Sequence, residues 1–285
     1  MAPLLGIATA NAASGRDGRG GLGPAGWERW SRAAAGLDVD VLAVQEVDHL
    51  LPRSGEVDQT SVLAEHLRAG GPVWTSRFAA AVHGTPGSAA TFRAAGPAAG
   101  ERPGEPSYGV ALLSRHPVRE WRELRVPPSR LRLPVPLPRG AGARVVWVPD
   151  EPRVALAARV AAPGADVTIV TTHLSFSPLH ARAQLRALAR WCRDLPRPLV
   201  LLGDLNLPAR WVTGPTGAAP ALLAPTHPAR RPRTQLDHVL LDDPAGELVV
   251  EAAGTRRLGE SDHLAVRVLL GRGDGGDVRP GAPRS

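Results

Sequence analysis

Six short polar motifs occur along the sequence, and each supplies carboxylate, amide or imidazole groups. In chain order they are Thr9-Ala10-Asn11, Gln45-Glu46, Thr172-His173-Leu174, Gly203-Asp204-Leu205-Asn206, Asp237-His238 and Ser261-Asp262-His263. Carboxylate and amide oxygens bind hard divalent cations, whereas imidazoles exchange protons near neutral pH. Together these groups predict a divalent-metal site for phosphate chemistry.

Glu46 follows an apolar run at residues 41–44, which predicts a strand that leaves the core at Gln45-Glu46. A carboxylate at that point is a suitable ligand for Mg²⁺ or Mn²⁺, because both ions prefer oxygen donors. Taken alone, this motif is equally compatible with a solvated carboxylate after a strand.

Asp204 and Asn206 follow another apolar run, at residues 199–202. If the strand continues past Gly203, the alternation of side chains puts Asp204 and Asn206 on the same side. Pro208 indicates that regular structure ends soon afterwards. An ordinary turn is the alternative, since Asp and Asn near Gly and Pro are typical turn residues.

Two histidines complete the candidate site. His263 precedes an alternating run at residues 264–268, and Asp237 supplies a carboxylate that could hold its imidazole. Such a carboxylate fixes the tautomer and stabilises the cationic ring. His173 follows an apolar run at residues 167–172, where a structural histidine bonded to neighbouring backbone is the alternative.

Most of these motifs lie beside apolar runs that predict strands, so a folded sheet would bring the polar groups to one rim. Several runs are continuously apolar, which is typical of strands covered on both faces and indicates a layered α/β architecture. Helical periodicity predicts helices outside the sheets. The predicted strands cover residues 4–8, 39–44, 110–113, 154–160, 167–171, 199–202, 236–241 and 264–270, and the predicted helices cover residues 27–35, 60–68 and 180–193.

Three segments rich in Gly, Pro and Ala, at residues 84–106, 126–152 and 213–232, are predicted to be loops. Candidate motifs lie on both sides of each segment, so we expect one domain over residues 1–270. Residues 271–285 contain almost no apolar side chains and are predicted to form a disordered tail.

The composition sets limits on partners and location. The formal charge is +7, but every basic residue is Arg, which is also typical of a GC-rich genome. The charge therefore permits a polyanionic substrate without establishing one. Cys192 has no partner for an intrachain disulfide, and its helical surroundings favour a buried thiol. The start lacks the basic segment of a signal peptide and no apolar run reaches membrane-spanning length, so we predict a cytoplasmic protein.

The ordered motifs together resemble the endonuclease/exonuclease/phosphatase superfamily, the DNase I-like metal-dependent phosphodiesterases, over residues 11–263. This resemblance implies a four-layered α/β sandwich, in which two packed mixed β-sheets are flanked by helices. It also implies a metal cofactor, Mg²⁺ or alternatively Mn²⁺, with Glu46 as the principal ligand and Asn11 and Asp262 close to the ion.

The resemblance further assigns catalytic roles. Asp204 and Asn206 look like the pair that orients the attacking water, and His263, held by Asp237, would contact the phosphate. His173 would stabilise the developing charge or help to protonate the leaving oxygen. Two further positions, Tyr108 and Arg153, resemble residues that contact the substrate phosphate, although a sheet-edge Tyr and a solvated Arg are equally compatible with the sequence.

Two positions depart from the patterns of particular relatives. Ala13 stands where abasic-site endonucleases usually carry an Asp, and Val110 stands where secreted DNase I-like enzymes carry a Glu. Those secreted enzymes also depend on disulfides, which one cysteine cannot form. A DNase I equivalent is therefore disfavoured.

The leading hypothesis from the resemblance is a divalent-metal-dependent phosphodiesterase or nuclease acting on nucleic acid or nucleotide-like substrates. A phospholipid or inositol-phosphate hydrolase is the alternative within the fold, although no membrane-binding amphipathic segment is evident. A noncatalytic binding module is the alternative outside enzymes, and no obligate protein partner is indicated. Arg230, Arg231 and Arg233 could collect phosphates near the site, but a solvated loop explains them more simply.

Overall fold

Strands that are apolar on both faces account for the layers of the molecule. In β1 (Leu5–Asn11), Leu5 and Ile7 belong to the core between two sheets, whereas Ala8 and Ala10 pack in a second core beneath helices. Alternate side chains leave opposite faces of a strand, so burial of every residue requires a covering layer on each face. The computed structural model describes residues 5–17, 19–68, 71–87, 91–96, 104–129, 133–136, 145–148 and 150–273.

Two mixed sheets form the centre of the molecule. The seven-stranded sheet has the order β14 (Leu248–Arg257), β15 (Leu264–Arg272), β1, β2 (Val41–His49), β5 (Ser107–Ser114), β3 (Thr75–Gly84) and β4 (Phe92–Ala94). The six-stranded sheet has the order β12 (Ala219–Pro220), β13 (Asp237–Asp242), β11 (Leu199–Asp204), β10 (Ala165–His173), β9 (Arg153–Ala162) and β6 (Val118–Val126). The pairs β1–β2 and β10–β11 are parallel, and the other pairs in both sheets are antiparallel.

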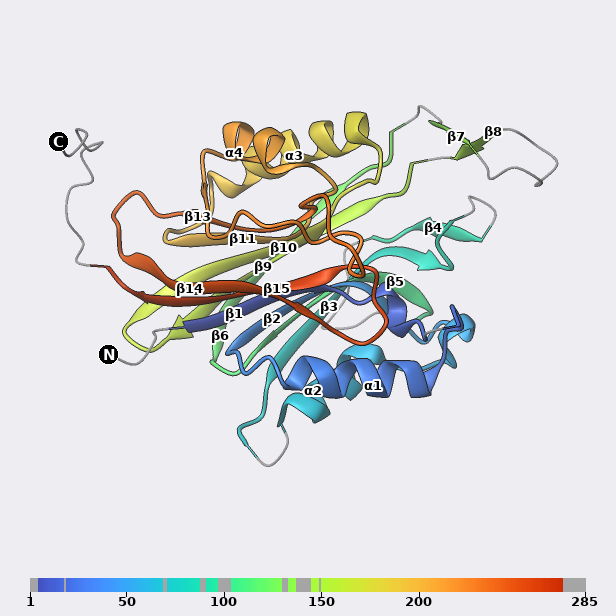
Figure 1. The fold of residues 1–285 in the computed structure, drawn as a ribbon, viewed down its shortest axis with the longest axis horizontal. Helices are drawn as coiled ribbons and strands as arrows, with labels where there is room; N and C mark the ends of the chain where they lie inside the picture. Colours follow the sequence, from blue (N-terminus) through green and yellow to red (C-terminus); the bar gives the residue numbers. More distant parts are fainter. Residues whose placement is uncertain are drawn as a thin grey trace.

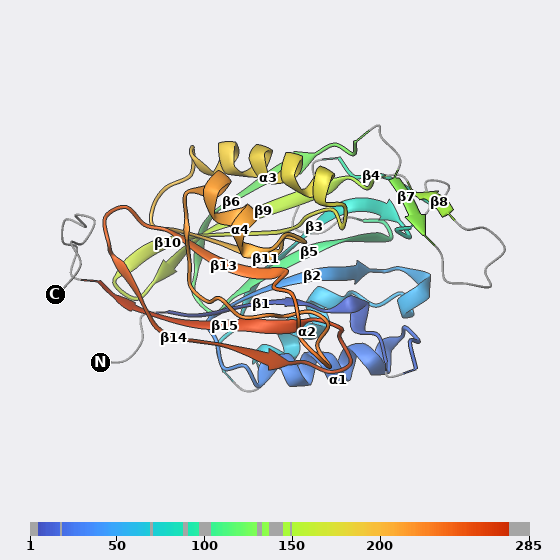
Figure 2. The same ribbon diagram turned by 45° about the horizontal axis from the view of Figure 1, so that its top comes forward.

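Helices cover the outer face of each sheet (Figure 1). The helices α1 (Pro24–Ala35) and α2 (Gln59–Arg68) lie on the seven-stranded sheet, where Trp27 and Trp30 are buried in the outer core. On the other side, α3 (Pro178–Cys192) and α4 (Ala209–Thr216) lie on the six-stranded sheet, and Figure 2 shows them above β9, β10 and β11. The predicted four-layered α/β sandwich is therefore confirmed.

Several elements were missed by the sequence patterns. The strand β6 alternates charged and apolar residues at a sheet edge, and β14 is exposed after Leu248, so neither shows a continuous apolar run. The strand β3 and the short helix α4, which contains Pro215, were also not predicted. Each of the three predicted loops contains a short strand: β4, the hairpin of β7 (Leu133–Pro136) and β8 (Val145–Val148), and β12.

The strand β15 continues to Arg272, past the predicted domain end at residue 270. Residues 274–285, the rest of the predicted tail, lie outside the described residues. In the part of the chain that the structure describes, no helix is both long and apolar enough to cross a membrane.

Candidate active site

Strand register places three polar side chains side by side at one edge of the six-stranded sheet. In the parallel pair β10–β11, His173 lies opposite Asp204, and in the antiparallel pair β11–β13, Asp204 lies opposite Asp237. The end of β10, the end of β11 and the start of β13 therefore coincide. Asp204, Asp237 and His173 are all buried.

Glu46 reaches the same region from the seven-stranded sheet, by a route that the sequence did not predict. The strand β2 continues to His49, so Glu46 does not lie beyond its end. The pairing of β2 with β5 shifts between Gln45 and Val47, and Glu46 itself has a left-handed φ of 56°. A β-bulge thus re-aims the Glu46 side chain toward the site.

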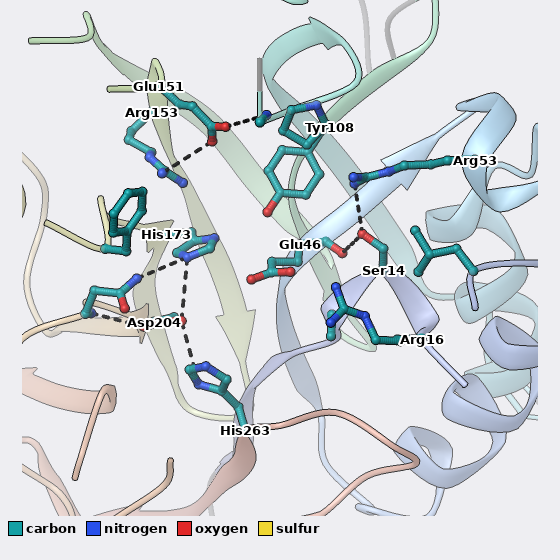
Figure 3. Close-up of a pocket in the computed structure, with 16 residues that line it drawn as sticks. Ser14, Arg16, Glu46, Arg53, Tyr108, Glu151, Arg153, His173, Asp204 and His263 are labelled. Atoms are coloured by element: carbon teal, nitrogen blue, oxygen red, sulfur yellow. Dashed lines mark hydrogen bonds and ion pairs between the residues drawn. The ribbon is translucent and has the colours of Figure 1, made fainter. Parts of the chain in front are cut away.

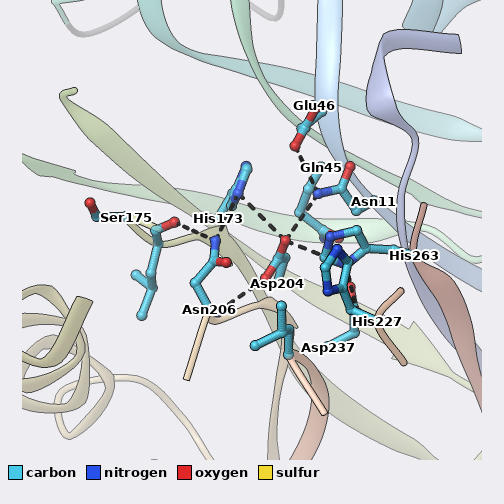
Figure 4. A network of polar contacts seen from close by, with 12 residues as sticks. Asn11, Gln45, Glu46, His173, Ser175, Asp204, Asn206, His227, Asp237 and His263 are labelled. Carbon is cyan, nitrogen blue, oxygen red and sulfur yellow. Dashed lines mark hydrogen bonds and ion pairs between the residues drawn. The ribbon is translucent and has the colours of Figure 1, made fainter. Parts of the chain in front are cut away.

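Asn11, the last residue of β1, links the two sheets (Figure 4). Its Nδ2 donates to Glu46 Oε1 at 3.0 Å and to Asp204 Oδ2 at 3.0 Å. Its Oδ1 accepts a hydrogen bond from the backbone N–H of Ala13 at 3.0 Å. In this arrangement Asn11 presents its amide nitrogen to the cluster, rather than the oxygen that a metal ligand would supply.

Asp204 and Asn206 converge through a turn, not through strand alternation. The strand β11 ends at Asp204, and Asn206 has a left-handed φ of 51°. The Asn206 backbone N–H donates to Asp204 Oδ1 at 3.0 Å, which is the local bond typical of an Asx turn. The turn alternative therefore describes the backbone, while both side chains still face the site.

His173 is held as a neutral imidazole. Asn206 Nδ2 lies 3.2 Å from His173 Nε2 and also donates to the carbonyl oxygen of Leu174 at 3.0 Å. When Asn206 donates, Nε2 accepts and the ring proton lies on Nδ1. Burial, together with the charges of Arg153 and His263, lowers the pKa of His173 well below its ordinary value.

His263 is held in the opposite charge state. Its Nδ1 lies 2.9 Å from Asp237 Oδ2 and 3.7 Å from Asp204 Oδ2. Burial alone would lower the pKa of His263, but the hydrogen bond and charge of Asp237 outweigh it and raise that pKa to about 10. Burial and the nearby charge of Asp237 raise the pKa of Asp204. The site thus combines a cationic imidazole with a carboxylate of increased basicity.

A cavity of about 310 Å³ opens above these groups and is lined by Glu46, His173, Asp204, Asn206 and His263, as well as by Tyr108 and Arg153 (Figure 3). Figure 3 shows the Tyr108 hydroxyl directed toward Glu46. Burial and the Glu46 charge raise the pKa of Tyr108 well above its ordinary value, so the phenol stays protonated. Arg153 is 6% exposed and lies 3.4 Å from Glu151.

Asp262 lies at the rim, outside the group of residues that line the cavity. Its side chain is 62% exposed, and its Oδ2 lies 3.9 Å from His227 Nε2. The His227 ring packs against the His263 ring with centroids 4.7 Å apart. Among the described residues, His227, Asp262 and His263 are close enough together to hold a metal ion, and so are Asp204, Asp237 and His263, but neither group contains Glu46.

The donor atoms beside Glu46 nevertheless fit a hard divalent cation. Glu46 is the only one of the three predicted metal-site residues that presents a carboxylate oxygen to the cavity. Burial raises the pKa of Glu46, and the hydrogen bond from Asn11 only partly offsets this effect. A cation would stabilise the ionised forms of Glu46 and Asp204, and oxygen donors suit Mg²⁺ or Mn²⁺.

Several cavity residues were not identified from the sequence. They are Ser14, Arg16, Arg53, Glu151 and Phe176 at the cavity, with His227 at the rim. The Ser175-Phe176 pair directly follows the His173 motif, which was the one available signal. Arg230, Arg231 and Arg233 do not line the cavity, and Arg230 lies 3.4 Å from Glu260.

Cys192 is buried and free, and burial raises the pKa of its thiol to about 12. It is the last residue of α3 and belongs to the buried apolar cluster that also contains Leu188 and Leu195. A thiol in such surroundings is a poor nucleophile, in agreement with the structural role inferred from the sequence.

Comparisons with known proteins agree with this fold. A model of the Endonuclease/Exonuclease/phosphatase family matches residues 8–263. None of the curated proteins compared matches the chain. An endonuclease/exonuclease/phosphatase from Beutenbergia cavernae DSM 12333 is 25% identical, with a TM-score of 0.66 and coverage of 94% of this chain and 72% of that chain.

More distant solved structures share the fold. A mannosyl-6-phosphatase from Bacteroides thetaiotaomicron VPI-5482 is 15% identical, with a TM-score of 0.56 and coverage of 93% of this chain and 99% of that chain. Truncated TDP2 from Caenorhabditis elegans is 16% identical, with a TM-score of 0.54 and coverage of 93% of this chain and 96% of that chain.

Proposed function

Because the chain belongs to the endonuclease/exonuclease/phosphatase family, whose members hydrolyse phosphate esters, we propose that it is a divalent-metal-dependent phosphodiesterase acting on nucleic acid or nucleotide-like substrates. The observation that carries this proposal is the Asn11 amide, which joins Glu46 and Asp204 at 3.0 Å each beneath a single cavity. Two carboxylates from different sheets, one proposed to bind the metal ion and one of increased basicity, thus face the same space.

Asp204 is the group best suited to activate water. Its raised pKa makes it a stronger base than an exposed Asp, and the backbone N–H of Asn206 holds one oxygen in place. Asp204 would orient the attacking water and accept its proton, and the Asn206 amide, whose Nδ2 already bonds His173 and Leu174, would help to orient that water through Oδ1. His173 would position that amide through its Nε2, which is a more restricted role than the proton donation suggested by the resemblance.

His263, Tyr108 and Arg153 would stabilise the negative charge that develops on the phosphate oxygens. His263 is held as an imidazolium by Asp237, and Tyr108 and Arg153 line the cavity as hydrogen-bond donors. When bound at Glu46, a Mg²⁺ or Mn²⁺ ion would supply Lewis-acid polarisation of a phosphate oxygen. Asp262 would act at the rim, through its charge.

The shape of the cavity supports a diester over a monoester. Its lining extends past Glu46 on two sides, toward His173 on one side and toward Arg53 on the other (Figure 3). A diester carries substituents on two ester oxygens and requires space on both sides. Phe176 also lines the cavity and is 51% exposed, so its ring is available to stack on a base.

The cytoplasmic location of the protein stays a prediction from the sequence.

The proposal is tested by hydrolysis of a substrate panel by the purified protein. The panel contains single- and double-stranded DNA, RNA, bis-p-nitrophenyl phosphate, p-nitrophenyl phosphate, inositol phosphates and sphingomyelin, each with Mg²⁺, Mn²⁺ or EDTA. We expect hydrolysis of the nucleic-acid diesters that EDTA abolishes and that Asp204→Asn lowers by about 100-fold or more. The matched control is Asp194→Asn, which neutralises an exposed carboxylate that does not line the cavity.

Other results would change the assignment. Preference for inositol phosphates or sphingomyelin would favour the lipid-related alternative, and preference for p-nitrophenyl phosphate would favour a monoesterase. Absence of hydrolysis across the panel, with Mg²⁺ still bound, would favour a noncatalytic binding module. Full activity in Asp204→Asn would refute the role assigned to this carboxylate.

A further inference from the structure

Three cavity residues lie on the side of Glu46 opposite His173 and have no part in the chemistry proposed above. They are Ser14, Arg16 and Arg53, which we call the arginine corner. Figure 3 shows the Arg16 guanidinium directed toward Ser14 and the cavity, on the same side of Glu46 as Arg53. Two guanidinium groups therefore face one part of the cavity.

The backbone that leads to Arg16 is locked by tertiary contacts. Ala13, Ser14 and Gly15 have successive left-handed φ angles of 46°, 52° and 75°, a conformation that L-residues adopt at a cost. The Ser14 hydroxyl bonds Asp48 Oδ1 at 3.0 Å, and the Ser14 carbonyl accepts from Gln59 Nε2 at 2.9 Å. At Gly15 a Cβ would lie 2.9 Å from the Cα of Trp27, so the turn packs directly on α1.

Arg53 is fixed with part of its guanidinium unused. Its Nε donates to Asp48 Oδ2 at 2.9 Å, and its Nη2 donates to Asp48 Oδ1 at 2.6 Å and to Ser14 Oγ at 3.2 Å. The side chain also lies over the Tyr108 ring, 5.4 Å from the centroid. These contacts leave the two N–H groups of Nη1 without a partner among the described residues.

Arg16 contributes the charge that is not neutralised. The buried Asp48 balances Arg53, but in the described ranges of the chain no carboxylate forms an ion pair with Arg16. Arg16 is exposed at the mouth of the cavity. The corner thus offers a net positive charge and free N–H donors, a combination that suits a phosphate oxygen.

We propose that the arginine corner binds a second phosphate of the substrate, next to the ester that is cleaved. The corner would then select diesters that carry a neighbouring phosphate over diesters that do not. This inference rests on the proposed function, because it assigns a second binding position in the same cavity. Arg16 and Arg53 would then be specificity-determining residues.

The test compares dithymidine monophosphate, TpT, with its terminally phosphorylated forms, pTpT and TpTp. All three contain the same cleavable diester, and the products are separated by chromatography so that the broken bond is identified. We expect kcat/KM for diester cleavage to be about tenfold or more higher for at least one phosphorylated form. In Arg16→Ala, that advantage should shrink by at least about threefold.

Arg19→Ala is the matched control, because Arg19 lies in the same loop, carries the same charge and does not line the cavity. Arg19→Ala should leave unchanged the ratio of kcat/KM for the phosphorylated form to kcat/KM for TpT. Arg53 is tested as Arg53→Lys, since removal of its charge would leave the buried Asp48 uncompensated. The lysine keeps the positive charge but lacks the planar guanidinium with its several N–H donors. The preference for the phosphorylated substrates should therefore fall. Equal kcat/KM for the three substrates, or the parental ratio in Arg16→Ala, would overturn the proposal.

Binding measurements separate failure of this proposal from failure of the proposed function. Calorimetric titration of TpT, pTpT and TpTp is made with Mg²⁺ and the Asp204→Asn protein, with and without Arg16→Ala. Tighter binding of a phosphorylated form that depends on Arg16 would support the corner even if no substrate were hydrolysed. Hydrolysis of all three substrates without an Arg16-dependent preference in either measurement would support the proposed phosphodiesterase function. It would refute the proposal that the arginine corner binds a second phosphate.

Discussion

At the scale of single residues, the site contains buried carboxylates close to a protonated imidazole. Glu46 and Asp204 have raised pKa values because burial disfavours their ionised forms, whereas His263 has a raised pKa because Asp237 stabilises its cation. A divalent cation would favour the ionised carboxylates, and the imidazolium would favour a bound phosphate. Under the proposed function, these residues would therefore suit a bound cation together with a negatively charged phosphate ester.

Glu46→Gln should separate metal binding from folding. The change removes the carboxylate charge but keeps the side-chain length, so we expect kcat/KM to fall by about 100-fold, or roughly 2.7 kcal/mol. Mg²⁺ should raise the Tm of the parent protein, because it binds the folded state, and should raise that of Glu46→Gln much less. Thermal unfolding with and without Mg²⁺ measures this effect. Glu65→Gln, at an exposed position on α2, is the control, and an equal Mg²⁺ response in Glu46→Gln would refute Glu46 as a ligand.

Asp237→Asn should change the charge state of His263. Asn can still accept a hydrogen bond from Nδ1 but carries no charge, so the pKa of His263 should fall from about 10 by about one unit or more. Titration of the His263 ring by NMR in metal-free protein measures the shift. An unchanged midpoint would show that Asp237 does not hold the imidazolium.

The ion pair of His263 and Asp237 also predicts that the stability of the protein depends on pH. The folded-state pKa of His263, about 10, lies above its ordinary value of 6.5. The contribution of His263 to the free energy of unfolding is therefore fully present below pH 6.5. That contribution is lost as the pH rises toward 10. The difference in free energy of unfolding between parent and Asp237→Asn should therefore be larger at pH 6 than at pH 9.5. Denaturant titrations at the two pH values test this, and a constant difference would contradict it.

At the scale of elements, the joint between β10 and β11 carries the site. Thr172 pairs with Gly203 immediately before His173 pairs with Asp204. Gly203 has a φ of 147°, and a Cβ there would collide with the backbone oxygen of Thr172. Only glycine allows the two parallel strands to approach in this way, so the backbone of β11 determines where Asp204 lies.

Gly203→Ala should destabilise this joint. Because the obstacle is backbone and not a flexible side chain, we expect a loss of about 3 kcal/mol or more in the free energy of unfolding. Gly254→Ala, where an added Cβ meets no atom within 4 Å, should change stability by only about 0.5 kcal/mol. Urea unfolding followed by circular dichroism compares the two. Equal stability of the two variants would mean that β10 and β11 can separate at little cost.

At the scale of the whole molecule, the site depends on the packing of two sheets. Asn11 comes from the seven-stranded sheet and Asp204 from the six-stranded sheet, and their contact is only 3.0 Å. The core between the sheets contains Ile7 on one side and Leu156 and Ile169 on the other. Contacts in this core therefore set the spacing of the candidate site residues Asn11 and Asp204, which they do not touch.

Leu156→Ala should weaken the whole assembly without changing the site chemistry. Leu156 is fully buried, so the cavity left by the change should cost about 2–5 kcal/mol. We expect activity and far-UV circular dichroism to be lost in one coincident transition, shifted to lower urea. Val249→Ala, at a position 47% exposed on β14, should behave like the parent. Loss of activity well before the loss of circular dichroism would show that the site loosens independently of the sheets.

The sequence by itself determined the residue types, their order and the strands beside which they lie. Apolar runs before Asn11, His173 and Asp204 are local patterns, and the carboxyl ends of parallel neighbours necessarily share an edge. The layered fold and the family resemblance followed from these patterns. Charged or exposed strands such as β6 and β14 escaped them, because one-sided burial leaves no continuous apolar run.

Only the tertiary structure decided how the groups meet. The bulge at Glu46, the turn at Asn206 and the left-handed run at Ser14 are each held by partners remote in sequence or by strand register. Asn11 and Asp204 are 193 residues apart, yet they share a hydrogen bond that fixes which atom of the amide faces the site. Local sequence cannot specify such contacts, because they depend on how two complete sheets pack. The same packing leaves Asp262 at the rim and brings Arg16 and Arg53 to one corner of the cavity.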